Sequence, residues 1–410
     1  MNDSATVYHH GYCTNVHAGI SIDAAKANLE RYACDVRQRL VPQGRLPVGL
    51  WLAEQAAHQL LREGRLADFR AWLEEKGLVP YTLNGFPQQD FHQPVVKHAV
   101  YEPTWLCQSR AEYTKMLIDV LAWLLPQGSV GTISTLPLGW PHAPWHADDL
   151  RTAAEHLLEV AQYAKRMEEE TGRHIVVAIE PEPGCVLNTA SEVVEFFTHY
   201  LFSGRQEAVA RRHLSVCHDI CHSGVMFEPQ AEALEQYRRA GIRLGKVQVS
   251  SAIHVPWDRC QDDPGAAADI RTQLARIGEP KYLHQTTAAA PHGRLQRLIE
   301  DLPHALSRWL ADDAIPRHPW RIHFHIPIYV DCFGSLQTTQ DDIGEATTYL
   351  EQYRQETVDG MPWFTGHYEV ETYAWTVLPP ELATDNLAAG IAQELEYFSI
   401  VRERIKMART

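Results

Sequence analysis

The octapeptide C-H-D-I-C-H-S-G at residues 217–224 places an aspartate and two histidines at the end of a short apolar run. The run over 214–219 has the length of a buried strand. Because side chains alternate along a strand, Asp219 shares a face with Cys217, and His222 follows in the loop. We interpret this stretch as one part of a metal site at the end of a strand.

The rest of the chain alternates short β-branched runs with longer segments that carry apolar residues at helical spacing. The predicted strands lie near 12–17, 47–52, 79–85, 130–136, 175–180, 214–219, 246–250, 282–287, 321–329 and 367–373. The predicted helices include 22–40, 55–76, 111–125, 149–170, 231–240 and 387–405. Such alternation predicts βαβ units and a parallel sheet.

The expected fold is a (β/α)8 TIM barrel in a single domain over residues 1–410. Ten candidate strands are two too many for such a barrel. We therefore expect a strand-containing insertion within 256–340, between late barrel strands, which would take up the pair 282–287 and 321–329. An open doubly wound sheet is the alternative. No G-x-G-x-x-G follows the first strand, which disfavours a dinucleotide-binding version.

Composition limits the partners. The chain has 37 basic and 52 acidic residues and a formal charge of -15, which disfavours nucleic acid, since phosphate binding depends on Lys and Arg. Eight cysteines without a disulfide framework, and the absence of a signal-like segment, predict a cytoplasmic protein. No run approaches the roughly 20 apolar residues that span a membrane.

Polar residues stand at the ends of several predicted strands. Glu180 ends the fifth, Gln248 lies near the end of the seventh, and Glu371 lies near the end of the last. In a barrel the carboxyl ends of the strands meet at one mouth. We therefore expect these side chains to meet Asp219 and His222 at one point.

Such a meeting requires positive charge. Several carboxylates buried together repel one another and lose hydration, so protons or a cation must neutralise them. Oxygen-rich ligands with one imidazole suit Mn²⁺, Mg²⁺, Co²⁺ or Fe²⁺, and further histidines shift the preference toward Zn²⁺. The sequence predicts a divalent metal ion without selecting one of these.

Each of these residues also has an ordinary structural interpretation. A glutamate at a strand end is more often solvated or caps a helix, and a strand glutamine such as Gln248 can satisfy neighbouring backbone. His222 could be a turn histidine anchored by Asp219. Cys217 and Cys221, with their neighbouring histidines, suggest a zinc finger, but they lack the second ligand pair that such a site needs.

In chain order, A-I-E-P-E-P-G, C-H-D-I-C-H-S-G, V-Q-V-S-S-A and E-V-E-T-Y resemble the xylose isomerase-like TIM barrel superfamily. Over nearly the whole length, Y-C-T-N-V-H-A-G, T-L-N-G-F-P, Y-L-H-Q and H-F-H-I-P-I are similar to one branch of it. That branch is the isomerase-like barrel of bacterial Ebo clusters, described as a metabolite traffic protein (EboE-like).

The resemblance implies a metal held by Glu180, Asp219, Gln248 and Glu371, with His222 binding either metal or substrate. Many relatives have histidine in place of Gln248, and the weaker amide donor disfavours a tight zinc site. The residues expected to bind substrate are Glu182, His222, His17, Asn84, His254 and His325. His323 and His325 share one side of their predicted strand and could enter the site, although Pro327 suits an edge position.

Three functions follow from these expectations. The first is a metal-dependent isomerase or epimerase acting on a sugar, a cyclitol or another polyhydroxylated small molecule, with Glu180 and Glu371 as the catalytic residues that remove and return a proton. The second is a metal-dependent phosphoesterase of the barrel endonuclease type acting on a small substrate. The third is a non-catalytic metabolite-binding protein. By analogy with the superfamily, we expect a homodimer or homotetramer.

Overall fold

A closed barrel of eight parallel strands forms the centre of the computed structural model, which describes residues 10–62, 64–310 and 315–409. The order around the barrel is β1-β16-β7-β6-β5-β4-β3-β2. The strands are β1 (Gly11–Cys13), β2 (Leu46–Trp51), β3 (Leu78–Asn84), β4 (Val130–Thr135), β5 (His174–Ile179), β6 (Leu214–Asp219), β7 (Leu244–Val249) and β16 (Tyr368–Val370). The predicted TIM barrel is confirmed, and the open-sheet alternative is wrong.

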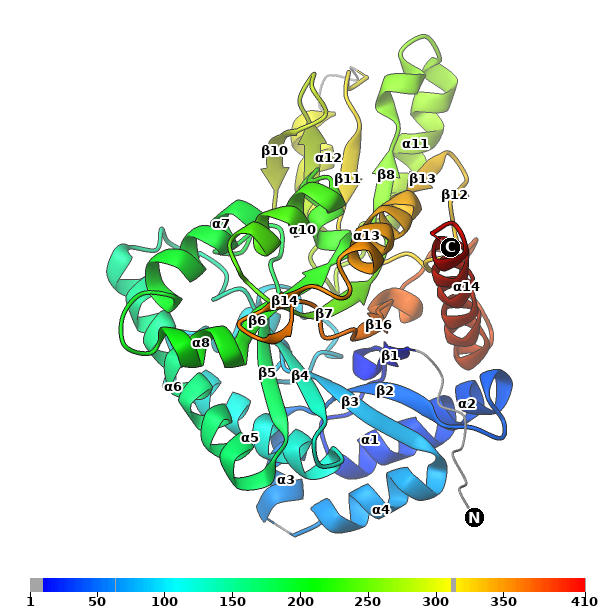
Figure 1. The fold of residues 1–410 in the computed structure, drawn as a ribbon. Coiled ribbons are helices and arrows are strands. Elements are labelled where there is room, and N and C mark those ends of the chain that lie inside the picture. Colours follow the sequence, from blue (N-terminus) through cyan, green and yellow to red (C-terminus); the bar gives the residue numbers. More distant parts are fainter. Residues whose placement is uncertain (1–9, 63, 311–314, 410) are drawn as a thin grey trace.

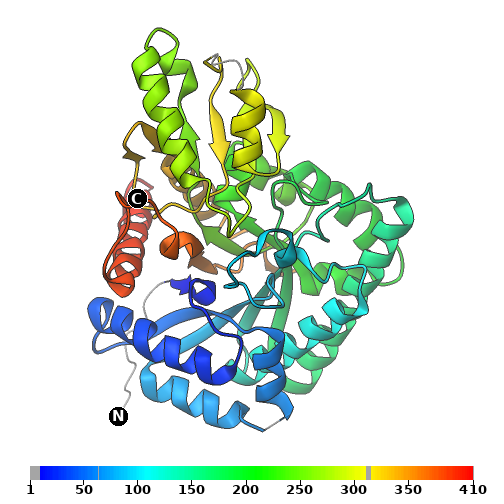
Figure 2. The same cartoon turned by 180° about the vertical axis from the view of Figure 1, so that it is seen from behind.

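Helices surround the barrel (Figures 1 and 2). Those matching the predicted segments are α1 (Ile22–Asn28), the π-helical turn η2 (Leu29–Ala33), α2 (Cys34–Leu40), α3 (Glu54–Arg62), α4 (Leu66–Lys76), α5 (Gln108–Leu124), α6 (Ala147–Thr171), α10 (Gln230–Arg239) and α14 (Leu387–Met407). The prediction of a single helix over 55–76 is wrong. The helix is interrupted between α3 and α4, where Gly64 adopts a positive φ of 68°.

Further α-helices complete the fold. They are α7 (Ala190–Phe196), α8 (Glu207–His213), α9 (Ile220–Val225), α11 (Pro264–Ile277), α12 (Leu302–Trp309) and α13 (Gln340–Gln352). The short helix α9 directly follows β6. Asp219 caps it by accepting a hydrogen bond from the backbone N–H of His222 at 2.9 Å, as the D-x-x-H spacing allows.

A six-stranded antiparallel sheet, here called the extra sheet, is inserted between β7 and β16 with the order β10-β9-β11-β8-β13-β12. Its strands are β8 (Ile253–Val255), β9 (Thr286–Ala289), β10 (Leu295–Ile299), β11 (Trp320–Ile322), β12 (Cys332–Phe333) and β13 (Leu336–Thr338). A separate hairpin pairs β14 (Thr357–Val358) with β15 (Met361–Pro362). The extra sheet stands above one end of the barrel (Figure 1).

The extra sheet contains both strands predicted to be surplus, with shorter or shifted bounds. It begins at Ile253, slightly before the predicted insertion, and the predicted run 321–329 stops being a strand at Ile322. One apolar cluster joins Trp257 and Trp320 of the insertion to Phe91 and Tyr373 from barrel loops. The insertion is thus packed against the barrel mouth.

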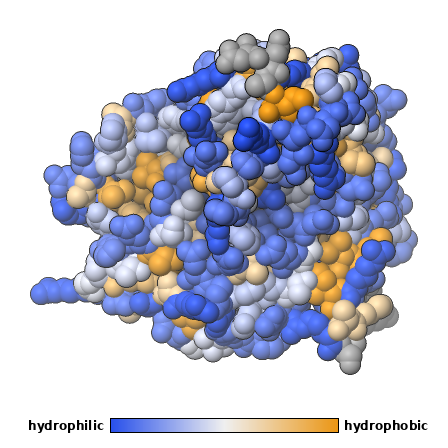
Figure 3. All heavy atoms as spheres, turned by 90° about the horizontal axis from the view of Figure 1, so that it is seen from above, coloured by the Kyte–Doolittle hydropathy of each residue, from blue (hydrophilic) through white to orange (hydrophobic). Residues whose placement is uncertain are grey.

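The surface seen from above is mainly hydrophilic, with apolar residues in small separate groups (Figure 3). Among the described residues, no helix has both the length and the apolar composition needed to cross a bilayer.

A buried ion pair lies inside the barrel. Its two residues each stand two positions before a predicted metal ligand, Lys246 before Gln248 and Glu369 before Glu371. Lys246 Nζ lies 2.7 Å from Glu369 Oε2, and both side chains are fully buried. Thr82 Oγ1 donates to the same carboxylate oxygen at 2.8 Å. A Cβ at Gly49 would come within 1.6 Å of Glu369 Oε1, so glycine leaves the room that this carboxylate needs.

We predict that Lys246→Met lowers the free energy of unfolding by about 3–5 kcal/mol, because it leaves the Glu369 carboxylate buried without its partner. Urea unfolding of wild type, Lys246→Met and the double variant Lys246→Met/Glu369→Leu measures the effect. The double variant should lose less stability than the single one, since it buries no unpaired charge. A single variant as stable as wild type would contradict this role of the ion pair.

Candidate metal centre

Three predicted metal-binding carboxylates meet at the mouth of the barrel. Glu180 follows β5, Asp219 ends β6 and Glu371 follows β16, and each is at most 5% exposed. Oxygen atoms of the three side chains lie within 4.8 Å of one another. Gln248 of β7 is fully buried, and its register partners are Asp219 on one side and Glu369 on the other.

Several side-chain atoms in this group, including oxygens that could bind a metal, have no hydrogen-bond partner. The oxygens are Glu180 Oε2, Asp219 Oδ2 and Gln248 Oε1; Gln248 Nε2 is also unpaired, but it is a hydrogen-bond donor and cannot bind a metal. The other oxygen of Asp219 accepts from Ser250 Oγ at 2.8 Å and from the His222 backbone. Buried polar atoms seldom stay unpaired. An oxygen-rich group with unpaired donors fits a divalent cation.

The ionisation of these carboxylates reflects their crowding. Burial, followed by the neighbouring Asp219 carboxylate, raises the pKa of Glu180 to about 7. Burial, with Glu180 and Asp219 nearby, raises the pKa of Glu371 well above its usual range. Burial acts in the same direction on Asp219, but His222 and His325 outweigh it and lower its pKa. The group therefore favours added positive charge, from protons or from a cation.

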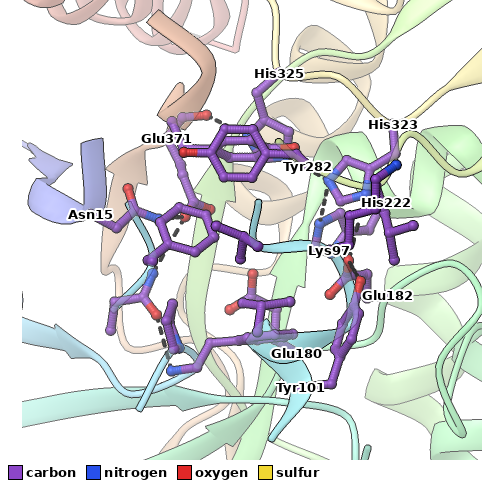
Figure 4. A pocket seen from close by; sticks show the side chains of 18 residues that line it. Asn15, Lys97, Tyr101, Glu180, Glu182, His222, Tyr282, His323, His325 and Glu371 are labelled. Carbon is purple, nitrogen blue, oxygen red and sulfur yellow. Dashed lines mark hydrogen bonds and ion pairs between the residues drawn. The ribbon is translucent and has the colours of Figure 1, made fainter. Parts of the chain in front are cut away.

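Three buried histidines stand next to the carboxylates (Figure 4). Nε2 of His323 lies 3.2 Å from Nε2 of His222 and 3.3 Å from Nε2 of His325. Asp219 Oδ2 lies 4.0 Å from Nε2 of both His222 and His325. The three imidazoles and Asp219 thus form a second donor group beside the first.

The opposite nitrogen of each ring contacts a carbonyl oxygen. The acceptors of the three Nδ1 atoms are Pro181 O at 2.9 Å from His222, Gln285 Oε1 at 2.8 Å from His323, and Glu371 O at 2.8 Å from His325. A carbonyl accepts only, so each Nδ1 carries the proton and a neutral ring has its lone pair on Nε2. Three converging lone pairs require a shared proton or a cation.

Residues of the insertion help to build this group. His323 and His325 lie in the irregular segment after β11, and Gln285 precedes β9. Gln285 Nε2 donates to Glu182 Oε1 at 3.0 Å, and Tyr101 Oη donates to the same oxygen at 2.7 Å. Gln285 and Tyr101 were not predicted, although Y-L-H-Q is one of the motifs in the sequence.

Further residues surround Glu371. Asn15 Nδ2 and Asn84 Nδ2 both donate to its Oε1, the second at 3.3 Å. The predicted residue Asn84 is thus in the site, while Asn15 was not singled out from its motif.

The structure does not bring His17 or His254 to this site. His17 stacks on Tyr32 with ring centroids 4.6 Å apart, and its Nε2 contacts Tyr12 Oη at 3.0 Å. It lines a separate small cavity. His254 lies in β8, where its register partners are Arg321 and Gln337 of the extra sheet.

The zinc-finger interpretation is not supported. His218 Nε2 contacts Gln230 Oε1 at 2.7 Å, away from the other candidate ligands. Cys217 and Cys221 are both fully buried, and the sulfur of Cys221 lies within 4.8 Å of ring nitrogens of His323 and His325.

The metal centre opens into a cavity that Glu180, Glu371 and His222 help to line. Figure 4 shows Glu180, Glu182 and Glu371 around this cavity together with the three histidines. The lining comes from barrel loops and from the insertion. The arrangement can hold cations and a small molecule side by side.

Neither a protein-family model nor a curated protein sequence matches this chain. Among solved structures, a xylose isomerase-like TIM barrel protein from Mycobacterium smegmatis in complex with magnesium is similar, with a TM-score of 0.50, 11% identity and 97% of each chain covered.

Two further structures have lower scores. The IolI protein with a bound zinc atom has a TM-score of 0.44 and 13% identity, covering 97% of this chain and 99% of its own. A probable 3-DHS dehydratase, AsbF, from Bacillus anthracis has a TM-score of 0.43 and 11% identity, covering 95% and 98%. At 11% identity, the similarity to the Mycobacterium structure shows a shared TIM-barrel fold.

Proposed function

We propose that this protein is a metal-dependent isomerase or epimerase that transfers a proton on a polyhydroxylated small molecule, such as a sugar or a cyclitol. The observation that carries the proposal is the pair of buried glutamates, Glu180 and Glu371, which line one cavity within a group of unpaired metal-binding donors. General acid–base chemistry needs two such groups within reach of one substrate.

Glu180, Asp219, Gln248 and Glu371 would hold the first ion, which is Mn²⁺, Mg²⁺, Co²⁺, Fe²⁺ or Zn²⁺. When bound, a divalent ion stabilises negative charge that develops on a substrate oxygen. His222, His323 and His325, with Asp219 between the two groups, would hold a second ion. Their converging Nε2 atoms support metal binding, rather than substrate binding, by His222.

The carboxylates have distinct surroundings that suit proton transfer. One oxygen of Glu371 accepts from Asn15 and Asn84, which fixes the orientation of the carboxylate. Glu180 keeps an unpaired oxygen. One glutamate would remove a proton from carbon and the other would return it. Glu182, held by Tyr101 and Gln285, would bind a substrate hydroxyl.

We also propose that the chain belongs to the Ebo-cluster branch, on the motifs that it shares with that branch over nearly its whole length. All eight cysteines are unpaired, which supports a reducing compartment such as the cytoplasm. A homodimer or homotetramer stays a prediction by analogy, as does a single domain over 1–410.

Phosphoester hydrolysis is the second candidate. The three-histidine group favours it, since two neighbouring ions are a feature of many phosphoesterases. The charge of the cavity disfavours it: of the described lining residues, only Lys97 is a lysine or arginine, and it pairs with Asp301. Phosphate release from a panel of small phosphoesters would move this function to first place.

Glu180→Gln and Glu371→Gln should each reduce proton transfer by roughly 10²–10⁴-fold, because a carboxamide cannot accept a proton from carbon. Deuterium incorporation at carbon, followed by NMR on sugars and cyclitols in D₂O, measures this. Glu228→Gln is the control, since Glu228 accepts from the Ala190 backbone outside the cavity. Unchanged incorporation in both variants would contradict the assigned roles. No deuterium incorporation with wild type would favour a non-catalytic metabolite-binding protein.

Wild type should bind two divalent ions per chain, and His323→Ala should bind one, because the second ion then has only two imidazoles of its own and Asp219, a carboxylate that the first ion also needs. Elemental analysis and calorimetric titration with Co²⁺ count the ions. His254→Ala is a matched control in the same insertion and should bind two. A stoichiometry unaffected by His323→Ala would show that the histidines share a proton instead.

A further inference from the structure

The cavity next to the metal centre has an extensive apolar wall. Phe91, Tyr282 and Tyr373 contact one another there, with ring centroids 5.2 Å apart for Phe91 and Tyr282, 5.7 Å for Phe91 and Tyr373, and 5.1 Å for Tyr282 and Tyr373. The wall adjoins the metal centre directly, since the Tyr373 and His325 rings are 4.6 Å apart. Aliphatic side chains extend it; they are Pro87, Val96, Val100 and Leu283.

This wall exceeds what a simple sugar would use. A sugar ring can stack one face on one aromatic ring, but hydroxyls cover its edges. Hydroxyls placed against valine and leucine side chains lose hydrogen bonds to water without replacement. The wall therefore fits a ligand with an apolar part of its own.

Among the described residues that line the cavity, no lysine or arginine is left unpaired to hold an anionic group away from the metal centre. Glu180, Glu182 and Glu371 contribute three carboxylates to the lining. Lys97 contributes one ammonium group, which pairs with Asp301. Phosphate recognition usually employs arginine, lysine or a helix N-terminus. The wall itself offers one unpaired donor, since Tyr282 Oη is buried without a partner, and this hydroxyl suits a neutral acceptor such as an ether or carbonyl oxygen.

We propose that the substrate is an uncharged amphiphile: a polyhydroxylated head reaches the metal centre, and an apolar ring or chain lies against Phe91, Tyr282 and Tyr373. This inference rests on the proposed function and specifies its substrate class. A cavity that binds free or phosphorylated sugars would not need this apolar wall.

Two chelators test the proposal because they share a metal-binding head and differ in the attached group. Acetohydroxamate carries a methyl group and benzohydroxamate carries a phenyl group. On protein loaded with Mn²⁺, benzohydroxamate should bind about tenfold more tightly or better, since its ring buries additional apolar surface. Isothermal titration calorimetry measures both affinities.

Phe91→Ala should remove most of the difference between the two chelators by weakening benzohydroxamate alone. Val100→Asn provides a second test at a half-buried wall position, in case the first variant fails to fold. Trp123→Ala removes a side chain that is 51% exposed, outside the cavity, and should change neither affinity.

Equal affinities for the two chelators in wild type would overturn the amphiphile proposal while leaving the metal centre in place. Equal losses of both chelators in Phe91→Ala would overturn it as well, because the wall would then act only through the metal centre. A separate Mn²⁺ titration isolates the other failure: a protein that binds no Mn²⁺ removes the proposed function, and this inference with it.

Discussion

The burial of three carboxylates at one barrel mouth is the constraint on which the rest of the site depends. Glu180 and Asp219 come from the neighbouring strands β5 and β6, and Glu371 comes from β16, which β7 separates from β6. Their oxygen atoms lie within 4.8 Å of one another because the strands end at one mouth. Among the described residues, no arginine or lysine forms a hydrogen bond or an ion pair with these three carboxylates. A bound cation would relieve their mutual repulsion, and the unpaired amide oxygen of Gln248 supplies a further donor.

The barrel and the insertion each contribute residues to the site. Beneath the carboxylates, Lys246 pairs with Glu369. Burial raises the pKa of Glu180 and of Glu371, and the charge of Lys246 acts against this increase without cancelling it. Above the carboxylates, the insertion contributes His323 and His325, while Gln285 fixes the ring orientation of His323 and the position of Glu182. The site is therefore completed by a segment that lies outside the eight-stranded barrel.

The parts that could be predicted from the sequence are those governed by local rules. Strand β6 has the predicted bounds, and its alternation correctly directs Asp219 toward Glu180 and Glu371, because parallel strands end at the same mouth. His17 was expected in the site and lies at the end of the strand predicted over 12–17, but β1 ends at Cys13. His254 pairs within the extra sheet. The path of an antiparallel insertion depends on distant strand pairing, which periodicity does not reveal.

Anomalous diffraction from crystals soaked in Mn²⁺ would test the metal centre most directly. We predict a strong anomalous-difference peak enclosed by Glu180, Asp219, Gln248 and Glu371. The same data would contradict our account if this position were empty while manganese occupied another ligand group, such as Glu168, His174 and His213 at the other end of β5.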